Sequence, residues 1–179
     1  MKTLVVDNGS EWFGQLVELL DGETTVVKTG DIHTVDPTIF DLIILSGGSN
    51  IGSVMHNPLL TEEFDLVKHV TVPLIGVCYG AEVIAYSYGA TLEKMDEKRQ
   101  GISILRLTDG KEIEIYEGHR FRIKNLPEEF IILGETDHAI EYFKHKEKPL
   151  YGLQFHPEAF VEITEGKELF RKIITNILI

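Results

Sequence analysis

The sequence predicts an α/β fold: a doubly wound, mostly parallel central sheet with helices on both faces and a small antiparallel extension. Two observations lead to this prediction. Up to about residue 90, short and nearly continuous apolar runs alternate with segments of helical spacing, which is typical of parallel strands buried on both faces. From about residue 91 onward, apolar and polar residues alternate instead, which indicates antiparallel strands with one solvated face.

Four apolar runs are expected to form the parallel strands. The first closes with an Asn-Gly turn and the third ends in paired glycines, and both features commonly end a strand. In chain order the runs are "TLVVDNG" (3–9), "TTVVKTG" (24–30), "FDLIILSGG" (40–48) and "VPLIGV" (72–77).

Four helices are expected to accompany these strands. Apolar residues at helical spacing mark the first, and Thr61 is expected to cap the second, which has acids in its first turn. We interpret the acids at 61–65 as a helix start with a solvated face. The expected helices cover 10–20, 61–69, 79–89 and 164–178.

The antiparallel extension is expected to begin at about residue 91. The segment "ISILRLTDGKEIEIYEG" (102–118) alternates around an Asp-Gly turn, which predicts a hairpin. Three further runs follow and are expected to form strands: "FIILGET" (130–136), "AIEYFKH" (139–145) and "LYGLQFH" (150–156).

Length and composition narrow the class of protein. The 179 residues contain no repeat or Pro/Gly/Ser-rich linker, so we expect a single domain over residues 1–179. One cysteine cannot form an internal disulfide, and a formal net charge of −12 argues against nucleic acid or an anionic membrane as the main partner. The start resembles no signal peptide and no apolar stretch is long enough to span a membrane. We therefore expect a cytoplasmic protein.

The single cysteine, Cys78, lies in "GVCYG" between an apolar run and a helix. Gly-x-Cys-x-Gly is the cysteine counterpart of the Gly-x-Ser-x-Gly nucleophile elbow, in which small neighbours allow a tight strand-to-helix turn. The start of a helix also stabilises a thiolate. A buried structural cysteine is the alternative, although the two glycines and the strand-to-helix context favour a nucleophile.

A thiolate nucleophile needs a base and a group that orients the base. Among seven histidines, only His156 stands in a segment suited to this, "YGLQFHPE". In an extended chain, side chains two residues apart face the same side, so Glu158 can accept a hydrogen bond from His156. Such a pair alone is commonly a solvated surface feature. Here it follows an apolar strand whose carboxyl end should meet the same sheet edge as Cys78.

The glycines of "LSGGSN" provide a candidate oxyanion hole. Glycines leave the backbone accessible to a substrate, so we expect the amides of Gly48 and Tyr79 to bind the oxyanion and Gly47 to border the substrate. A simple turn at the end of the strand would explain the glycines equally well.

The segments "DNGS", "LSGGS", "GVCYG" and "YGLQFHPE" together resemble the class I glutamine amidotransferase family, in its order and along the whole chain. The resemblance implies a catalytic triad of Cys78, His156 and Glu158. It also implies that the enzyme hydrolyses L-glutamine to glutamate and ammonia through a cysteine thioester. The branch that serves GMP synthase is the most similar, which implies delivery of ammonia to a separate ATP pyrophosphatase subunit.

Two positions depart from the family pattern. Glu82 stands where the family usually has a glutamine that contacts the substrate. The γ-glutamyl hydrolase branch also has a glutamate at this position. His119, in "YEGHRFRIKNLP", matches the histidine of a Ser-His-Gly-Asp stretch, but Gly118 replaces the serine and Arg120 and Phe121 replace Gly-Asp. Glu82 and His119 are the expected substrate-binding side chains.

Two other functions remain open from the sequence. One is a stand-alone cysteine hydrolase of γ-glutamyl compounds, or an amidotransferase with a different acceptor. The other is a binding or regulatory protein that keeps the fold without turnover. No spacing of residues indicates a metal or a nucleotide phosphate, so no metal and no cofactor is expected.

Overall fold

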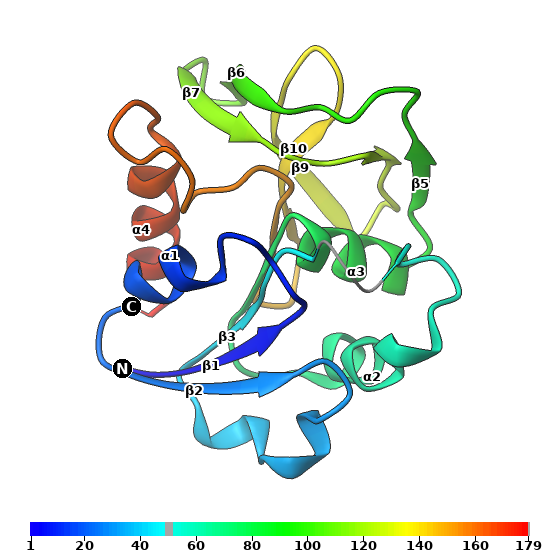
Figure 1. Cartoon of the computed structure of the whole chain (residues 1–179), viewed down its shortest axis with the longest axis vertical. Helices are drawn as coiled ribbons and strands as arrows, with labels where there is room; N and C mark the ends of the chain where they lie inside the picture. The colour runs from blue at the N-terminus through cyan, green and yellow to red at the C-terminus, as the bar shows by residue number, and fades with distance from the viewer. Residues whose placement is uncertain (49–51, 179) are drawn as a thin grey trace.

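A computed structural model describes residues 1–48 and 52–178 of the chain. Within these residues, nine strands form one sheet in the order β2-β1-β3-β4-β11-β10-β9-β6-β7, and β5 and β8 form a separate small sheet. Figure 1 shows helices on both sides of the large sheet. The predicted fold class is therefore confirmed.

The first five strands in this order are all parallel to one another. The apolar runs form them because side chains on both faces are buried: every residue of the two central strands β3 and β4 is buried. The five strands are β1 (Lys2–Asp7), β2 (Glu23–Lys28), β3 (Leu42–Leu45), β4 (Leu74–Val77) and β11 (Leu150–Leu153).

The rest of the large sheet is antiparallel, as the alternating pattern predicts. The predicted hairpin is present, with Ile104 of β6 opposite Glu114 of β7. The strands are β6 (Gly101–Leu107), β7 (Glu112–Glu117), β9 (Phe130–Glu135) and β10 (Ile140–His145). The small antiparallel sheet pairs β5 (Thr91–Lys94) with β8 (Phe121–Asn125), two short strands that the sequence analysis did not identify.

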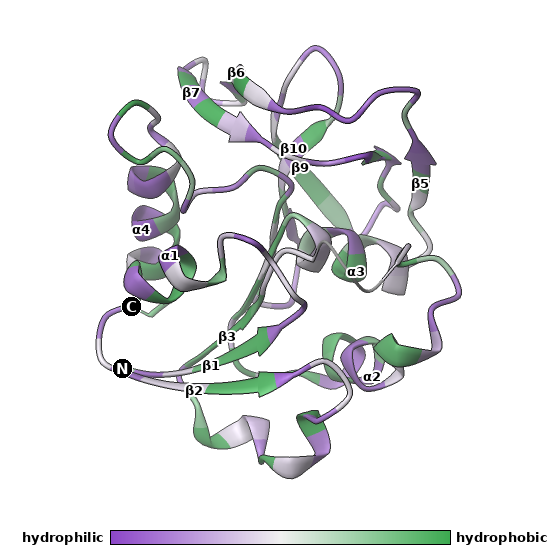
Figure 2. Cartoon of the chain, viewed as in Figure 1, coloured by the Kyte–Doolittle hydropathy of each residue, from purple (hydrophilic) through white to green (hydrophobic). Residues whose placement is uncertain are grey.

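The helices divide the core into two layers. Leu16 and Phe170 place α1 (Phe13–Glu18) and α4 (Gly166–Ile177) on one face of the sheet. Leu66 and Ile84 place α2 (Thr61–His69) and α3 (Tyr79–Ser87) on the other. Figure 2 shows hydrophobic residues along the central strands and polar ones on the outer side of α4. Three short 3₁₀ turns, Ile32–Thr34, Pro37–Ile39 and Pro58–Leu60, complete the connections.

Three local predictions are wrong. Thr61 is the first residue of α2 and donates its hydroxyl hydrogen to the carbonyl of Pro58, because the preceding 3₁₀ turn runs directly into the helix. Glu63 is fully buried instead of facing solvent, and it accepts a hydrogen bond from Asn8. The helix expected over 10–20 spans only Phe13–Glu18.

The last parallel strand is also shorter than predicted. The strand expected over 150–156 ends at Leu153, and residues 154–159 form bends and a turn. Because β11 pairs in parallel with β4 and aligns Leu153 with Val77, the two strands end side by side. The His-Pro-Glu segment after β11 therefore begins next to the carboxyl end of β4. Among the described residues, no helix has the length and apolar character needed to cross a membrane.

Candidate active site

Cys78 occupies a strained turn between β4 and α3. Its backbone has φ 49° and ψ −103°, a combination that a residue with a side chain rarely adopts. The Cys78 amide donates to the carbonyl of Leu153 at 2.6 Å, which fixes the turn against β11. A Cβ at Gly76 would overlap the backbone of Gly80, and one at Gly80 would overlap the carbonyl of Leu45. Both glycines of "GVCYG" are therefore required sterically.

His156 and Glu158 form a buried pair. Nδ1 of His156 lies 2.9 Å from Oε1 of Glu158, and the two side chains are 6% and 0% exposed. Glycines leave room for the imidazole: a Cβ at Gly47 would lie 3.1 Å from its Cε1, and a Cβ at Gly118 would lie 3.1 Å from its Cδ2. Gly47, expected at the substrate, thus packs against one edge of the ring.

The structure brings Cys78 together with this pair. Burial alone would lower the pKa of His156, but the charges of Cys78 and Glu158 and hydrogen bonds with both side chains raise the pKa well above its ordinary value. Because Nδ1 is bonded to Glu158, Nε2 is left for the sulfur. The charges of Cys78 and Glu158 therefore favour an imidazolium at His156.

The predicted oxyanion-hole residues lie side by side. A Cβ at Gly48 would approach Cγ of the Tyr79 ring to 2.9 Å, so only glycine allows this close packing. Neither the Gly48 amide nor the Tyr79 amide donates a hydrogen bond to another described residue. Tyr79 begins α3 directly after Cys78, where helix N–H groups have no partner within the helix. Their assignment as oxyanion donors stays a prediction.

A cavity of about 400 Å³ opens over these groups, within the range of small-molecule sites. Its wall includes Lys94, Lys98 and Arg120, which bring positive charge to an otherwise acidic protein. The predicted residues that line it are Gly48, Cys78, Tyr79, Glu82, His119 and His156.

Glu82 is buried in this wall and paired with an amide. Nε2 of Gln154 donates to Oε1 of Glu82 at 3.1 Å and lies 4.0 Å from Sγ of Cys78. Burial raises the pKa of Glu82 to about 7, although the Gln154 hydrogen bond and the charge of His119 lower it. The side chain is therefore protonated in about half of the molecules at pH 7. The protonated form offers both a donor and an acceptor, as a glutamine does.

His119 lines the cavity with both ring nitrogens already engaged. Nδ1 lies 2.8 Å from the carbonyl oxygen of Phe121, and Nε2 lies 3.2 Å from Oε1 of Glu141. Contact of this ring with a substrate stays a prediction.

Sequence reasoning missed two sets of residues near the site. Gln154 could have been found, because it precedes His156 by two residues in the same segment. The buried acids Glu117 and Glu141 carried no such signal, since they join His119 from strands β7 and β10.

Comparisons with known proteins identify the family. The profile of the "Glutamine amidotransferase class-I" family matches residues 4–176. The chain belongs to the class I glutamine amidotransferase family. The family expected from the sequence, and with it the enzyme class of a glutamine-hydrolysing amidotransferase, are therefore confirmed.

Individual members of the family cover almost the whole chain. A glutamine-hydrolysing GMP synthase subunit of Thermoplasma volcanium is 32% identical over 97% of this chain and is covered over 91% of its own length. The GMP synthase of Thermosipho melanesiensis is 29% identical over 99% of this chain, and the match covers 36% of the length of that protein. A crystal structure from Thermoplasma acidophilum, provisionally described as a GMP synthase subunit, superposes with a TM-score of 0.84 at 29% identity, over 98% of this chain and 92% of that one.

Proposed function

We propose that the protein is the glutaminase subunit of a two-subunit, ATP-dependent synthetase, and that Cys78, His156 and Glu158 carry its chemistry. The observation that supports this most strongly is the buried 2.9 Å contact between His156 and Glu158, together with the position of Cys78 and His156 in the wall of one cavity. L-Glutamine is the substrate, and glutamate and ammonia are the products.

The first step forms a thioester. The Cys78 thiolate attacks the side-chain amide carbon of glutamine, and the carbonyl oxygen takes up the negative charge. The amides of Gly48 and Tyr79 stabilise this oxyanion. His156 donates its Nε2 proton to the amide nitrogen, the carbon–nitrogen bond breaks and ammonia leaves. The products of this step are ammonia, a γ-glutamyl thioester on Cys78 and a neutral His156.

The second step regenerates the enzyme. Neutral His156 takes a proton from water, and the hydroxyl oxygen attacks the thioester carbon. The carbon–sulfur bond breaks, the new γ-carboxylic acid releases its proton to water as glutamate leaves, and the thiolate and imidazolium are restored. Glu158 holds the ring in position throughout, as the carboxylate of a triad does.

The cavity wall supports an amino-acid substrate. Lys94, Lys98 and Arg120 supply positive charge that suits the α-carboxylate of glutamine. Neutral Glu82 reproduces the donor and acceptor pattern of the glutamine usual at this position. Its replacement by an acid is therefore compatible with glutamine as substrate near neutral pH.

The relatives support the identity of the acceptor. The similar proteins from Thermoplasma are each described as one subunit of GMP synthase, and such a description implies a second chain. We infer that ammonia passes to a separate ATP pyrophosphatase subunit that makes GMP, in the cytoplasm. A stand-alone hydrolase of γ-glutamyl compounds is the second candidate, which Glu82 favours because an acid at this position is shared with that branch.

An ammonia-release assay separates these candidates. The protein is incubated with glutamine, with γ-glutamyl peptides, and with glutamine plus a candidate ATP pyrophosphatase subunit, its nucleotide substrate and ATP. The proposal expects glutaminase activity that rises when the second subunit is present and is coupled to its product. Cleavage of γ-glutamyl peptides in preference to glutamine, unaffected by the second subunit, would contradict it.

A further inference from the structure

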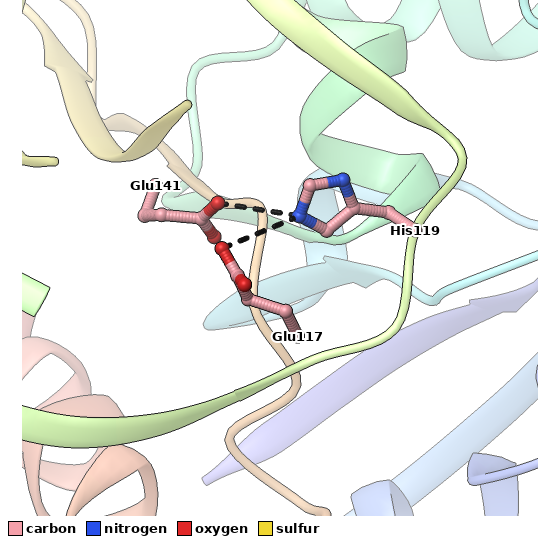
Figure 3. Close-up of side chains that lie close together, drawn as sticks. All are labelled: Glu117, His119 and Glu141. Atoms are coloured by element: carbon pink, nitrogen blue, oxygen red, sulfur yellow. Dashed lines mark hydrogen bonds and ion pairs between the residues drawn. The ribbon is translucent and has the colours of Figure 1, made fainter. Parts of the chain in front are cut away.

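A second cluster of titratable side chains lies behind the cavity wall. Glu117 at the end of β7, His119 just after it and Glu141 on β10 converge on one point, as Figure 3 shows. Each can supply a ligand atom within 4.8 Å of the others. Their side chains are only 2%, 1% and 0% exposed. The cluster is thus buried in the protein, although His119 also borders the cavity.

The histidine is oriented as metal-binding histidines are. Nδ1 of His119 lies 2.8 Å from the carbonyl oxygen of Phe121, so the hydrogen bond to this acceptor assigns the Nδ1 proton. Nε2 faces the two carboxylates, 3.2 Å from Oε1 of Glu141 and 3.9 Å from Oε1 of Glu117 (Figure 3). A bound ion would take the place of the proton that Nε2 shares with them. A histidine that binds a metal typically donates its other N–H to a carbonyl or carboxylate in this way.

The carboxylates are also held in place by neighbours. Ser103 Oγ donates to Oε2 of Glu117 at 2.6 Å, and Thr136 Oγ1 donates to its Oε1 at 3.2 Å. Oε2 of Glu141 is buried and has no hydrogen-bond partner in the described part of the chain. Within that part, neither acid forms an ion pair with a lysine or an arginine. Two buried carboxylates therefore lack a cationic partner other than the histidine.

We propose that Glu117, His119 and Glu141 bind a divalent transition-metal ion such as Zn²⁺. Metal–ligand bonds of about 2.0–2.2 Å in a tetrahedral site place ligand atoms about 3.3–3.5 Å apart. Nε2 of His119 lies 3.2 Å from Glu141 Oε1 and 3.9 Å from Glu117 Oε1, close to that spacing. One imidazole and two carboxylates suit Zn²⁺, Fe²⁺ or Mn²⁺ rather than a soft, thiolate-preferring ion.

Charge balance supports the same assignment. A divalent ion, two carboxylates and a neutral imidazole sum to zero, which is the arrangement that a buried site tolerates best.

The ion would have a positioning role. It would link β7 and the segment after it to β10, and so fix the ring of His119 in the cavity wall. The sequence gives no spacing signal for it, because two ligands lie at 117 and 119 and the third lies on β10.

The test measures Co²⁺ and Zn²⁺ binding to the full-length Cys78→Ala protein, so that the only thiol cannot contribute. We expect one ion per chain by equilibrium dialysis and elemental analysis, and the visible absorption of tetrahedral Co²⁺. Saturating Zn²⁺, at about a hundredfold its dissociation constant, should raise the melting temperature by roughly 5–10 °C.

Two variants and a matched control locate the ion. Glu141→Gln and Glu117→Gln should each weaken binding about 100-fold or more. Glu63→Gln removes a different buried carboxylate, which bonds to Asn8, and should leave binding unchanged. If Glu141→Gln and Glu117→Gln do not fold, the Nε2 resonance of His119 is measured in the Cys78→Ala protein by nuclear magnetic resonance. We expect Zn²⁺ to shift this resonance.

Three results would overturn the proposal. The first is no binding of Co²⁺ or Zn²⁺ below about 100 μM, which is weaker than any built zinc site. The second is binding that Glu141→Gln and Glu117→Gln do not affect, or an unmoved His119 resonance. The third is an infrared band of a neutral carboxylic acid, lost in Glu141→Gln, that persists at saturating metal, because the two acids would then share a proton instead of an ion.

Discussion

Replacement of Glu82 by glutamine tests whether this side chain works as a neutral acid. Glu82 is buried, accepts a hydrogen bond from Gln154 and has a pKa raised to about 7 by burial. Above that pH it ionises, loses its donor and adds a negative charge to the cavity wall. Glu82→Gln keeps the acceptor for Gln154 and supplies a donor at every pH.

The expected size of the effect follows from the pKa. If only the neutral form supports glutamine, about one molecule in eleven is competent at pH 8 and about one in a hundred at pH 9. The ratio of kcat/KM in the variant to that in the unmodified protein should therefore rise from about 2 at pH 7 to about 10 at pH 8. Taking this ratio cancels the pH dependence of the steps that both proteins share.

The assay is ammonia release from glutamine between pH 6 and 9, after treatment with a chelator so that a nearby cation does not alter the titration. Glu11→Gln is the matched control, because Glu11 is an exposed acid at the rim of the same cavity. The ratio of kcat/KM in Glu11→Gln to that in the unmodified protein should stay constant with pH. A constant ratio for Glu82→Gln as well would refute the argument that a protonated Glu82 takes the place of glutamine.

Two further predictions concern buried carboxylates. Glu158→Gln should lower kcat by about 10³–10⁴, because an amide no longer holds His156 in its protonated, oriented form; an activity within tenfold of the unmodified protein would count against the assigned role. Glu63 has a pKa that burial raises from 4.5 to about 7, so the folded state binds this proton more tightly than the unfolded state does. The stability that it contributes is therefore complete below pH 4.5 and is lost as the pH rises through 7, by about 3 kcal/mol. Urea denaturation at several pH values should show a loss that is smaller by this amount in Glu63→Gln than in the unmodified protein, because Glu82 and Glu141 titrate in both. Equal losses in the two proteins would contradict it.

Much of the fold could be predicted because hydrophobic periodicity reflects which faces are buried. The runs at Leu42–Leu45 and Leu74–Val77 are apolar throughout and lie in the middle of the sheet. The alternation in Gly101–Leu107 and Glu112–Glu117 marks the hairpin. The short strands β5 and β8 could not be identified, because four or five residues at the protein edge carry too little pattern.

The local geometry around the proposed reacting groups could be predicted because each stands in a motif that is nearly independent of the rest of the chain. "GVCYG" forces a tight turn at Cys78, and His-Pro-Glu brings His156 and Glu158 together within three residues. The burial of the surrounding acids could not be predicted in this way. Glu63 pairs with Asn8 across 55 positions, and Glu141 meets His119 across 22, so only the folded chain reveals that these carboxylates are buried.

The most direct test of the account is the reaction of Cys78 with an electrophilic glutamine analogue, followed by mass spectrometry of the intact protein and its peptides. We expect one adduct, on Cys78, that free glutamine slows and that forms orders of magnitude more slowly in His156→Ala. An absent adduct, or an equal rate in His156→Ala, would contradict a thiolate that is activated by the imidazole.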